Sequence, residues 1–99
     1  MTTEHFNQLS PARAERLAIL AEECGEVVQI VGKILRHGYQ GKHPDTGVTN
    51  TQALEEELGH LEYAISRLVL HDVDPSEVRR HATNKMHTIH QWLHHTTAT

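Results

Sequence analysis

Acidic residues recur at helical spacing in two separate segments of the chain. The segments are residues 22–26, which read EECGE, and residues 55–60, which read EEELGH. Side chains three positions apart lie about 60° apart on a helix, one turn along its axis. Glu23 and Glu26 can therefore converge on one point, and Glu57 and His60 can do the same. Three carboxylates and one imidazole are ligands typical of a site for a divalent metal ion.

Apolar residues flank the acids of the first segment. Ile19 lies four residues before Glu23, and Ile30 lies four residues after Glu26, so each acid has an apolar neighbour on its own helix face. This pattern predicts packing on both sides of the acids, where an unpaired carboxylate is costly unless a cation compensates its charge. The alternative is a solvated helix face, which is the usual state of Glu-rich helical stretches.

Local start and stop signals define the first helix and the loop after it. Ser10 is suited to the N-cap and Pro11 to the first helical position, so a helix should run over about 11–37. Gly38 ends it. The stretch 38–50 contains three glycines and a proline without hydrophobic periodicity, which predicts a long loop.

Two further helices complete an all-α fold of three helices. Leucine and isoleucine residues at spacings of three and four predict a helix over about 51–71, with Asn50 or Thr51 as its cap. Asp74 followed by Pro75 is a strong helix start. The apolar ladder that follows predicts a third helix over about 75–95. Because the chain is short, we expect oligomerisation to supply much of its stability.

The composition limits the partners and the location of the protein. Its 99 residues predict one domain over 1–99, with a loose lead at 1–9 and a frayed end at 96–99. A net charge of −4 argues against a nucleic-acid partner. No membrane span or export signal is recognisable, and we expect a cytoplasmic protein. The single cysteine, Cys24, falls within the apolar stripe, which predicts a small core residue.

The two acidic segments and their surroundings resemble a known family. LAEECGEVVQIVGKILRHG, followed by LEEELGHLEYAI, is similar to the MazG-like all-α nucleoside triphosphate pyrophosphohydrolases. Their signature is E-E-x-x-E on one helix and E-x-x-D on the next, and the similarity covers about residues 17–70. The resemblance implies a helical bundle built as a homodimer or homotetramer, with Mg²⁺ held by the acids. It also implies hydrolysis of a nucleoside triphosphate to the monophosphate and pyrophosphate.

The resemblance assigns a role to each acid of the two segments. Glu23, Glu26 and Glu57 match the metal-binding acids. Glu22 and Glu56 match acids beside the metal that orient or deprotonate the attacking water, which makes them the candidate catalytic residues.

One position of the signature departs from the family, and two lysines are candidate substrate-binding residues. His60 stands where the family has Asp. As a metal ligand it offers a nitrogen in place of a hard oxygen, which shifts the preference from Mg²⁺ toward Mn²⁺ or another transition metal. Lys33, seven residues after Glu26, and Lys85 on the third helix are placed to contact a phosphate. Ordinary solvated lysines are the alternative at both positions.

Two other functions are compatible with the same residues. Glu57-x-x-His60 with Glu23 or Glu26 is also the ligand set of ferritin-like di-iron carboxylate bundles, in which a symmetric dimer doubles the site. The other alternative is a non-catalytic helical oligomer that binds a nucleotide or a protein partner.

Overall fold

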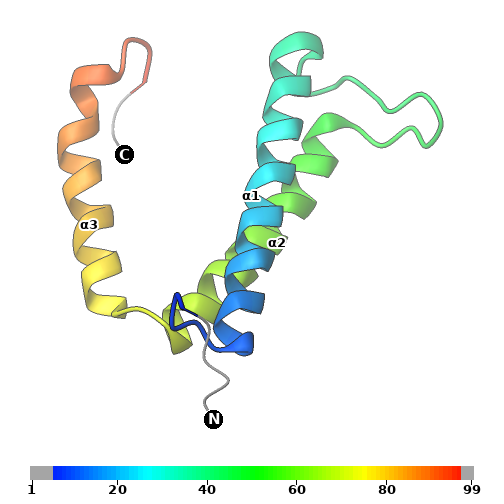
Figure 1. Cartoon of the computed structure of the whole chain (residues 1–99). Coiled ribbons are helices and arrows are strands. Elements are labelled where there is room, and N and C mark those ends of the chain that lie inside the picture. The colour runs from blue at the N-terminus through cyan, green and yellow to red at the C-terminus, as the bar shows by residue number, and fades with distance from the viewer. Residues whose placement is uncertain (1–5, 97–99) are drawn as a thin grey trace. The chain divides into compact units, whose positions relative to one another are not determined.

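The computed structural model describes residues 6–96, and this part of the chain is helical without a β-strand. Its elements are α1 (Pro11–His37), α2 (Asn50–His71), α3 (Pro75–Thr88) and the 3₁₀ helix η1 (Ile89–Trp92) (Figure 1). The all-α prediction is confirmed for the described residues. The predicted loose lead and frayed end fall partly on residues 1–5 and 97–99, which lie outside them. None of the described helices combines the length and hydropathy needed to cross a membrane.

The ends of α1 follow the local signals of the sequence. The Ser10 hydroxyl accepts a hydrogen bond of 3.2 Å from the Arg13 amide, and Pro11 occupies the first turn, where no amide hydrogen is needed. At the other end, Gly38 adopts φ of 81° and donates its amide hydrogen to the Ile34 carbonyl. A positive φ is strained for other residues, which explains why the helix ends at a glycine.

The start of α2 is a capping box centred one residue earlier than predicted. The Thr49 hydroxyl accepts a hydrogen bond from the Gln52 amide, and the Gln52 side chain accepts one from the Thr49 amide, at 3.1 and 3.0 Å. These reciprocal bonds satisfy two amides that the helix itself leaves free. The cap is therefore Thr49, whereas the sequence favoured Asn50 or Thr51.

α1, α2 and the loop between them form an antiparallel hairpin within a unit that extends to Leu68 (Figure 1). The least exposed side chains of α1 include Leu20, Glu23, Val27, Ile30 and Ile34, and those of α2 include Leu54, Glu57, Leu61, Ala64 and Leu68. Both series advance by three or four residues, the spacing of a seam between two packed helices. Glu23 and Glu57 thus occupy seam positions that apolar residues normally fill.

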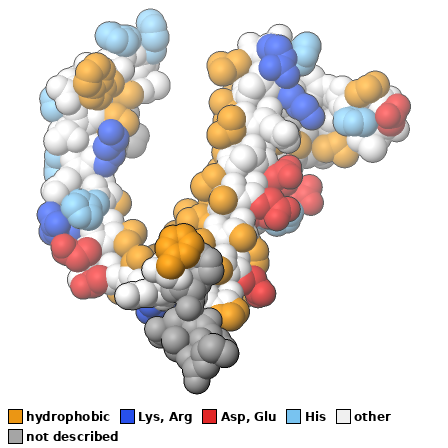
Figure 2. Space-filling view, in the orientation of Figure 1, with side chains coloured by type: hydrophobic (Ala, Val, Ile, Leu, Met, Phe, Trp, Pro, Cys, Tyr) orange, Lys and Arg blue, Asp and Glu red, His pale blue; other side chains and the backbone are white. Residues whose placement is uncertain are grey.

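Apart from the seam, α1 has an apolar side that is exposed. Leu17, Val28, Val31 and Leu35 are exposed on α1 at helical spacing, and acidic and hydrophobic side chains gather on different sides of the hairpin in Figure 2. Cys24 lies on the apolar side and is exposed. The prediction of a core cysteine was therefore wrong, because the stripe that contains Cys24 points away from α2.

The second unit begins at Val69 and contains α3 and η1. Asp74 caps α3 by accepting a hydrogen bond of 2.9 Å from the Ser76 amide, as the sequence predicted. The α-helix ends at Thr88, earlier than the predicted 95, and continues as the 3₁₀ turn η1. Ile89 and Leu93 maintain the apolar spacing across this change, so the sequence pattern alone does not reveal it.

Candidate metal centre

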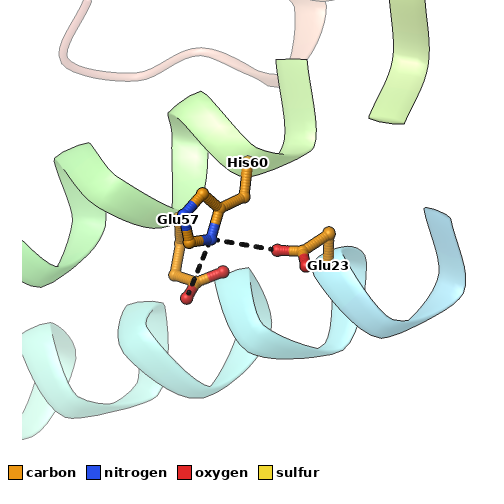
Figure 3. Close-up of side chains that lie close together, drawn as sticks. All are labelled: Glu23, Glu57 and His60. Atoms are coloured by element: carbon orange, nitrogen blue, oxygen red, sulfur yellow. Dashed lines mark ion pairs between the residues drawn. The ribbon is translucent and has the colours of Figure 1, made fainter. Parts of the chain in front are cut away.

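Three side chains from the two arms of the hairpin meet in one cluster. Glu23 comes from α1, and Glu57 and His60 come from successive turns of α2 (Figure 3). Each offers one ligand atom, and these atoms lie within 4.8 Å of one another. Within residues 6–96 this is the one group of three His, Cys, Asp or Glu side chains gathered so closely. We call it the Glu–Glu–His cluster.

The cluster combines two shielded carboxylates with a more accessible imidazole. His60 Nδ1 lies 3.5 Å from Glu23 Oε2 and 3.7 Å from Glu57 Oε1. The Glu23 and Glu57 side chains are only 19% and 16% exposed, while that of His60 is 51% exposed. The carboxylates are thus held within the seam, and the imidazole covers them on the solvent side.

Two oxygen atoms of the cluster are buried without a hydrogen-bond partner. They are Glu23 Oε2 and Glu57 Oε2. Ionised carboxylates are acceptors only, so the two acids cannot satisfy each other. A buried acceptor left in this state costs free energy, and either a shared proton or a bound cation removes that cost. The donor set therefore fits a divalent cation with oxygen and nitrogen ligands, such as Mn²⁺ or Fe²⁺.

The electrostatics of the cluster favour a positive charge between the acids. Burial raises the pKa of Glu57, and the adjacent Glu23 carboxyl raises it further, through the hydrogen bond that Glu57 can donate to it once protonated and through its charge. Glu26 contributes in the same direction, and His60 opposes it. Glu57 therefore ionises less readily than an ordinary glutamate, as expected for carboxylates crowded together at a shielded site.

The other predicted acids surround the cluster at different distances. Glu26 is exposed and is not part of the group, although its charge acts on Glu57. Glu56 Oε1 lies 3.9 Å from His60 Nε2, and its side chain is 68% exposed. Glu22 is exposed beside Glu23 and does not belong to the group. The structure thus brings together three of the four predicted metal ligands, with Glu56 at the solvent edge of His60.

The two predicted lysines lie in different units. Lys33 lines a pocket at the loop end of the hairpin, together with Arg36 and Lys42. Lys85 is exposed on α3, in the second unit. Arg36 and Lys42 were not predicted as binding residues from the sequence. The spacing of Lys33 and Arg36, one helical turn apart, was the available signal for the first of these.

No protein-family model, no curated protein and no solved structure matches this chain. The similarity to the MazG-like pyrophosphohydrolases therefore rests on the motif residues alone.

Proposed function

We propose that the protein is a metal-dependent hydrolase that cleaves a nucleoside triphosphate to the monophosphate and pyrophosphate. The observation that carries this proposal is the pair of buried carboxylate oxygens, on Glu23 and Glu57, that lack a hydrogen-bond partner beside His60. This arrangement supports a divalent cation. The nucleotide as substrate is supported by the resemblance of the two acidic motifs to the MazG-like signature.

Glu23, Glu57 and His60 are the residues that would hold the cation. A divalent ion held there would supply charge neutralisation for the phosphoanhydride and would lower the pKa of an attacking water. Glu56 is mostly exposed and lies beside His60 Nε2, so its carboxylate is available to accept a proton from water at the open side of the cluster. Glu26 adds negative charge near Glu57 and thereby strengthens the attraction for a cation.

The exposed apolar side of the hairpin supports an oligomer as the working form. Only Ala64 is a buried hydrophobic residue among those described, which is a small core for a hairpin of two long helices. A second copy that packs its own apolar side against this one would form a bundle of four helices and leave the acidic side open. We therefore propose a homo-oligomer as the working form.

A second candidate function follows from the composition of the Glu–Glu–His cluster. The Glu–Glu–His cluster contains a Glu from one helix and a Glu-x-x-His pair from the other, and this is half of the ligand set of a ferritin-like di-metal site. Symmetric pairing of two copies would supply the other half. Oxygen consumption that depends on added Fe²⁺ is the activity that distinguishes this candidate.

The experiment that tests the first proposal is the release of pyrophosphate from a panel of nucleoside triphosphates with Mn²⁺ or Mg²⁺. We expect release by the wild-type protein and its loss in Glu23→Gln and Glu57→Gln. Glu55→Gln is the matched control, because Glu55 is exposed on α2 and lies outside the cluster. Wild-type protein that binds Mn²⁺ but releases no pyrophosphate from any triphosphate would show that hydrolysis is not its function. Equal activity in Glu57→Gln would show that the cluster is not the catalytic site.

A further inference from the structure

A pocket of about 510 Å³ lies between the last turns of α1, the start of α2 and the loop that joins them. Its lining includes the cations Lys33, Arg36 and Lys42 and contains no Asp or Glu. Three of the nine Lys and Arg residues of a chain with net charge −4 thus line one pocket. None of the three forms an ion pair within the described part of the chain. The lining is therefore a local concentration of positive charge, and the one acid of the loop, Asp45, is not part of it.

The pocket wall also contains apolar residues beside the three cations. Ile30, Pro44, Val48 and Ala53 contribute to the lining. A concave site of a few hundred Å³ that combines apolar walls with a few charged groups is typical of small-molecule binding. This combination fits a ligand that has an apolar or aromatic body and an anionic group, and it does not resemble the extended basic stripe of a nucleic-acid interface.

The loop that forms one wall is fixed by hydrogen bonds to its own ends. The Asn50 side chain donates to the Gly38 carbonyl at 3.0 Å, and the Asn50 amide donates to the Gly41 carbonyl at 2.8 Å. Further along, the His43 amide donates to the Val48 carbonyl at 2.8 Å. These contacts join both ends of the loop to the hairpin, so the pocket exists before a ligand arrives and little ordering is needed on binding.

Gly41 shows how closely the loop approaches α1. A Cβ atom at this position would lie 3.1 Å from both the Cβ and the carbonyl oxygen of His37, and 3.0 Å from the Asn50 side-chain nitrogen. A side chain here would push the loop away from the helix. The glycine therefore allows the loop to lie close to His37 at the end of α1, where both line the pocket.

The pocket and the Glu–Glu–His cluster occupy the same side of the hairpin. On α1, Ile30, Lys33 and His37 follow Glu26 at spacings of four, three and four residues, which places them on one face. Lys33 lies about 10 Å along the helix axis from Glu26. In Figure 2, Lys and Arg side chains gather on the hairpin near its loop, beyond the group of acidic side chains.

From these observations we infer that the pocket is a binding site for an organic phosphate, independent of any metal ion. Lys33, Arg36 and Lys42 bind the phosphate, and the apolar wall receives the organic part of the ligand. This site is separate from the Glu–Glu–His cluster and goes beyond the hydrolysis proposed above, since it requires neither a cation nor turnover.

The test is a titration of the isotope-labelled full chain by NMR with adenosine 5′-monophosphate in the presence of EDTA. We expect the phosphate ester to shift the amide signals of the loop, including Gly41 and Val48. Adenosine at the same concentration should shift them far less, because it lacks the charge. Chelation removes the metal site from the measurement, so a failure of the hydrolase proposal leaves this result intact, and the reverse also holds.

Substitutions distinguish the effect of positive charge in the pocket from the effect of the protein's net charge. Lys33→Gln, Arg36→Gln and Lys42→Gln should each weaken binding by about three- to tenfold, the loss expected for one charged hydrogen bond that is partly screened. Lys42→Arg should retain binding. Arg67→Gln is the control of equal charge, because Arg67 is exposed on α2 outside the pocket. The inference is wrong if adenosine shifts the same signals equally, if Arg67→Gln weakens binding as much, or if no pocket amide responds.

Discussion

Glu23 and Glu57 meet across the seam between α1 and α2, and each carries an Oε2 atom that is buried without a hydrogen-bond partner. Leu20 and Val27 precede and follow Glu23 in its seam, and Leu54 and Leu61 do the same for Glu57. Leucine at these two positions would pack the hairpin better. The seam therefore contains a local loss of stability that a proton or a cation between the carboxylates can reverse.

We expect Glu57→Gln to stabilise the metal-free protein at neutral pH and to weaken Mn²⁺ binding by at least about tenfold. The pKa of Glu57 is raised by burial and by Glu23, so the ionised carboxylate opposes folding above that raised pKa. The free-energy cost of the ionised Glu57 carboxylate disappears as the pH falls through its raised pKa to the ordinary pKa of a glutamate. The gain in melting temperature should thus be greater at about pH 8 than at about pH 4. Thermal denaturation in EDTA, followed by circular dichroism, measures it.

Glu55→Gln provides the comparison for this experiment. It removes the same charge from the same helix at an exposed position outside the cluster. We expect it to change the melting temperature and the Mn²⁺ affinity little. If Glu57→Gln destabilises the metal-free protein relative to Glu55→Gln, the crowding of the two carboxylates is not the dominant effect at this site.

His60→Asp should raise Mg²⁺-dependent pyrophosphate release and reduce the advantage of Mn²⁺ over Mg²⁺. The substitution replaces a nitrogen ligand by a charged oxygen, which Mg²⁺ prefers. His60→Asn isolates the effect of the ligand atom from that of the charge, because the amide oxygen is neutral. Rates with each metal should be compared at saturating substrate. A fall in the Mg²⁺-dependent rate of His60→Asp would mean that the imidazole has a role of its own.

The capping box at the start of α2 should contribute measurably to stability. Thr49→Ala and Gln52→Ala each remove one of the two reciprocal hydrogen bonds, and we expect each to lower the free energy of unfolding by about 1 kcal/mol. The double substitution should cost less than the sum, since the two side chains act on one motif. Urea denaturation measures these values, with Gln29→Ala on the exposed surface of α1 as the control. Fully additive losses would contradict a reciprocal motif.

The sequence predicted the helices well where local chemistry decides their ends. Ser10 with Pro11, Gly38, and Asp74 with Pro75 act within one turn of each boundary, and the structure has helix ends at all three. The end of α3 was missed because no glycine or proline marks Thr88. Cys24 was misplaced because an apolar stripe does not reveal whether its partner is another part of the same chain.

The candidate site was predictable in part for the same physical reason. Spacing of three residues places Glu57 beside His60 on one helix, and the antiparallel hairpin brings Glu23 opposite them. The basic pocket was not predictable, because Lys42 reaches it through hydrogen bonds between residues twelve positions apart, such as Asn50 to Gly38. Helical periodicity contains no information on a loop of this kind.

The cap of α3 should make the second unit sensitive to acid. Hydrogen bonds from the Ser76 side chain and amide lower the pKa of Asp74. The carboxylate therefore stabilises the helix fully above the ordinary pKa of Asp, and this stabilisation is lost as the pH falls through the lowered value. We expect amide signals of α3 to report loss of helix in that range. In Asp74→Asn the side chain still accepts a hydrogen bond but does not titrate. The substitution should therefore remove this acid-induced loss of helix.

Glu77 titrates nearby and must be separated from the effect of Asp74. Its pKa is lowered by a two-pronged hydrogen bond with Arg80, at 3.0 Å for both contacts. The comparison of Asp74→Asn with wild type should therefore be repeated in a Glu77→Gln background. An unchanged acid response after Asp74→Asn in that background would show that the cap does not control the stability of α3.

The apolar side of the hairpin predicts how the oligomeric state responds to charge. Val28 is 70% exposed and Leu35 is 81% exposed, although each belongs to a stripe suited to helix packing. Val28→Lys places a charge that a packed interface must desolvate, so we expect a smaller species by sedimentation at every concentration tested. Gln29→Lys adds the same type of charge one residue away, outside this stripe, and should leave the mass unchanged. A wild-type protein that sediments as a monomer at high concentration would show that a second copy does not cover this side.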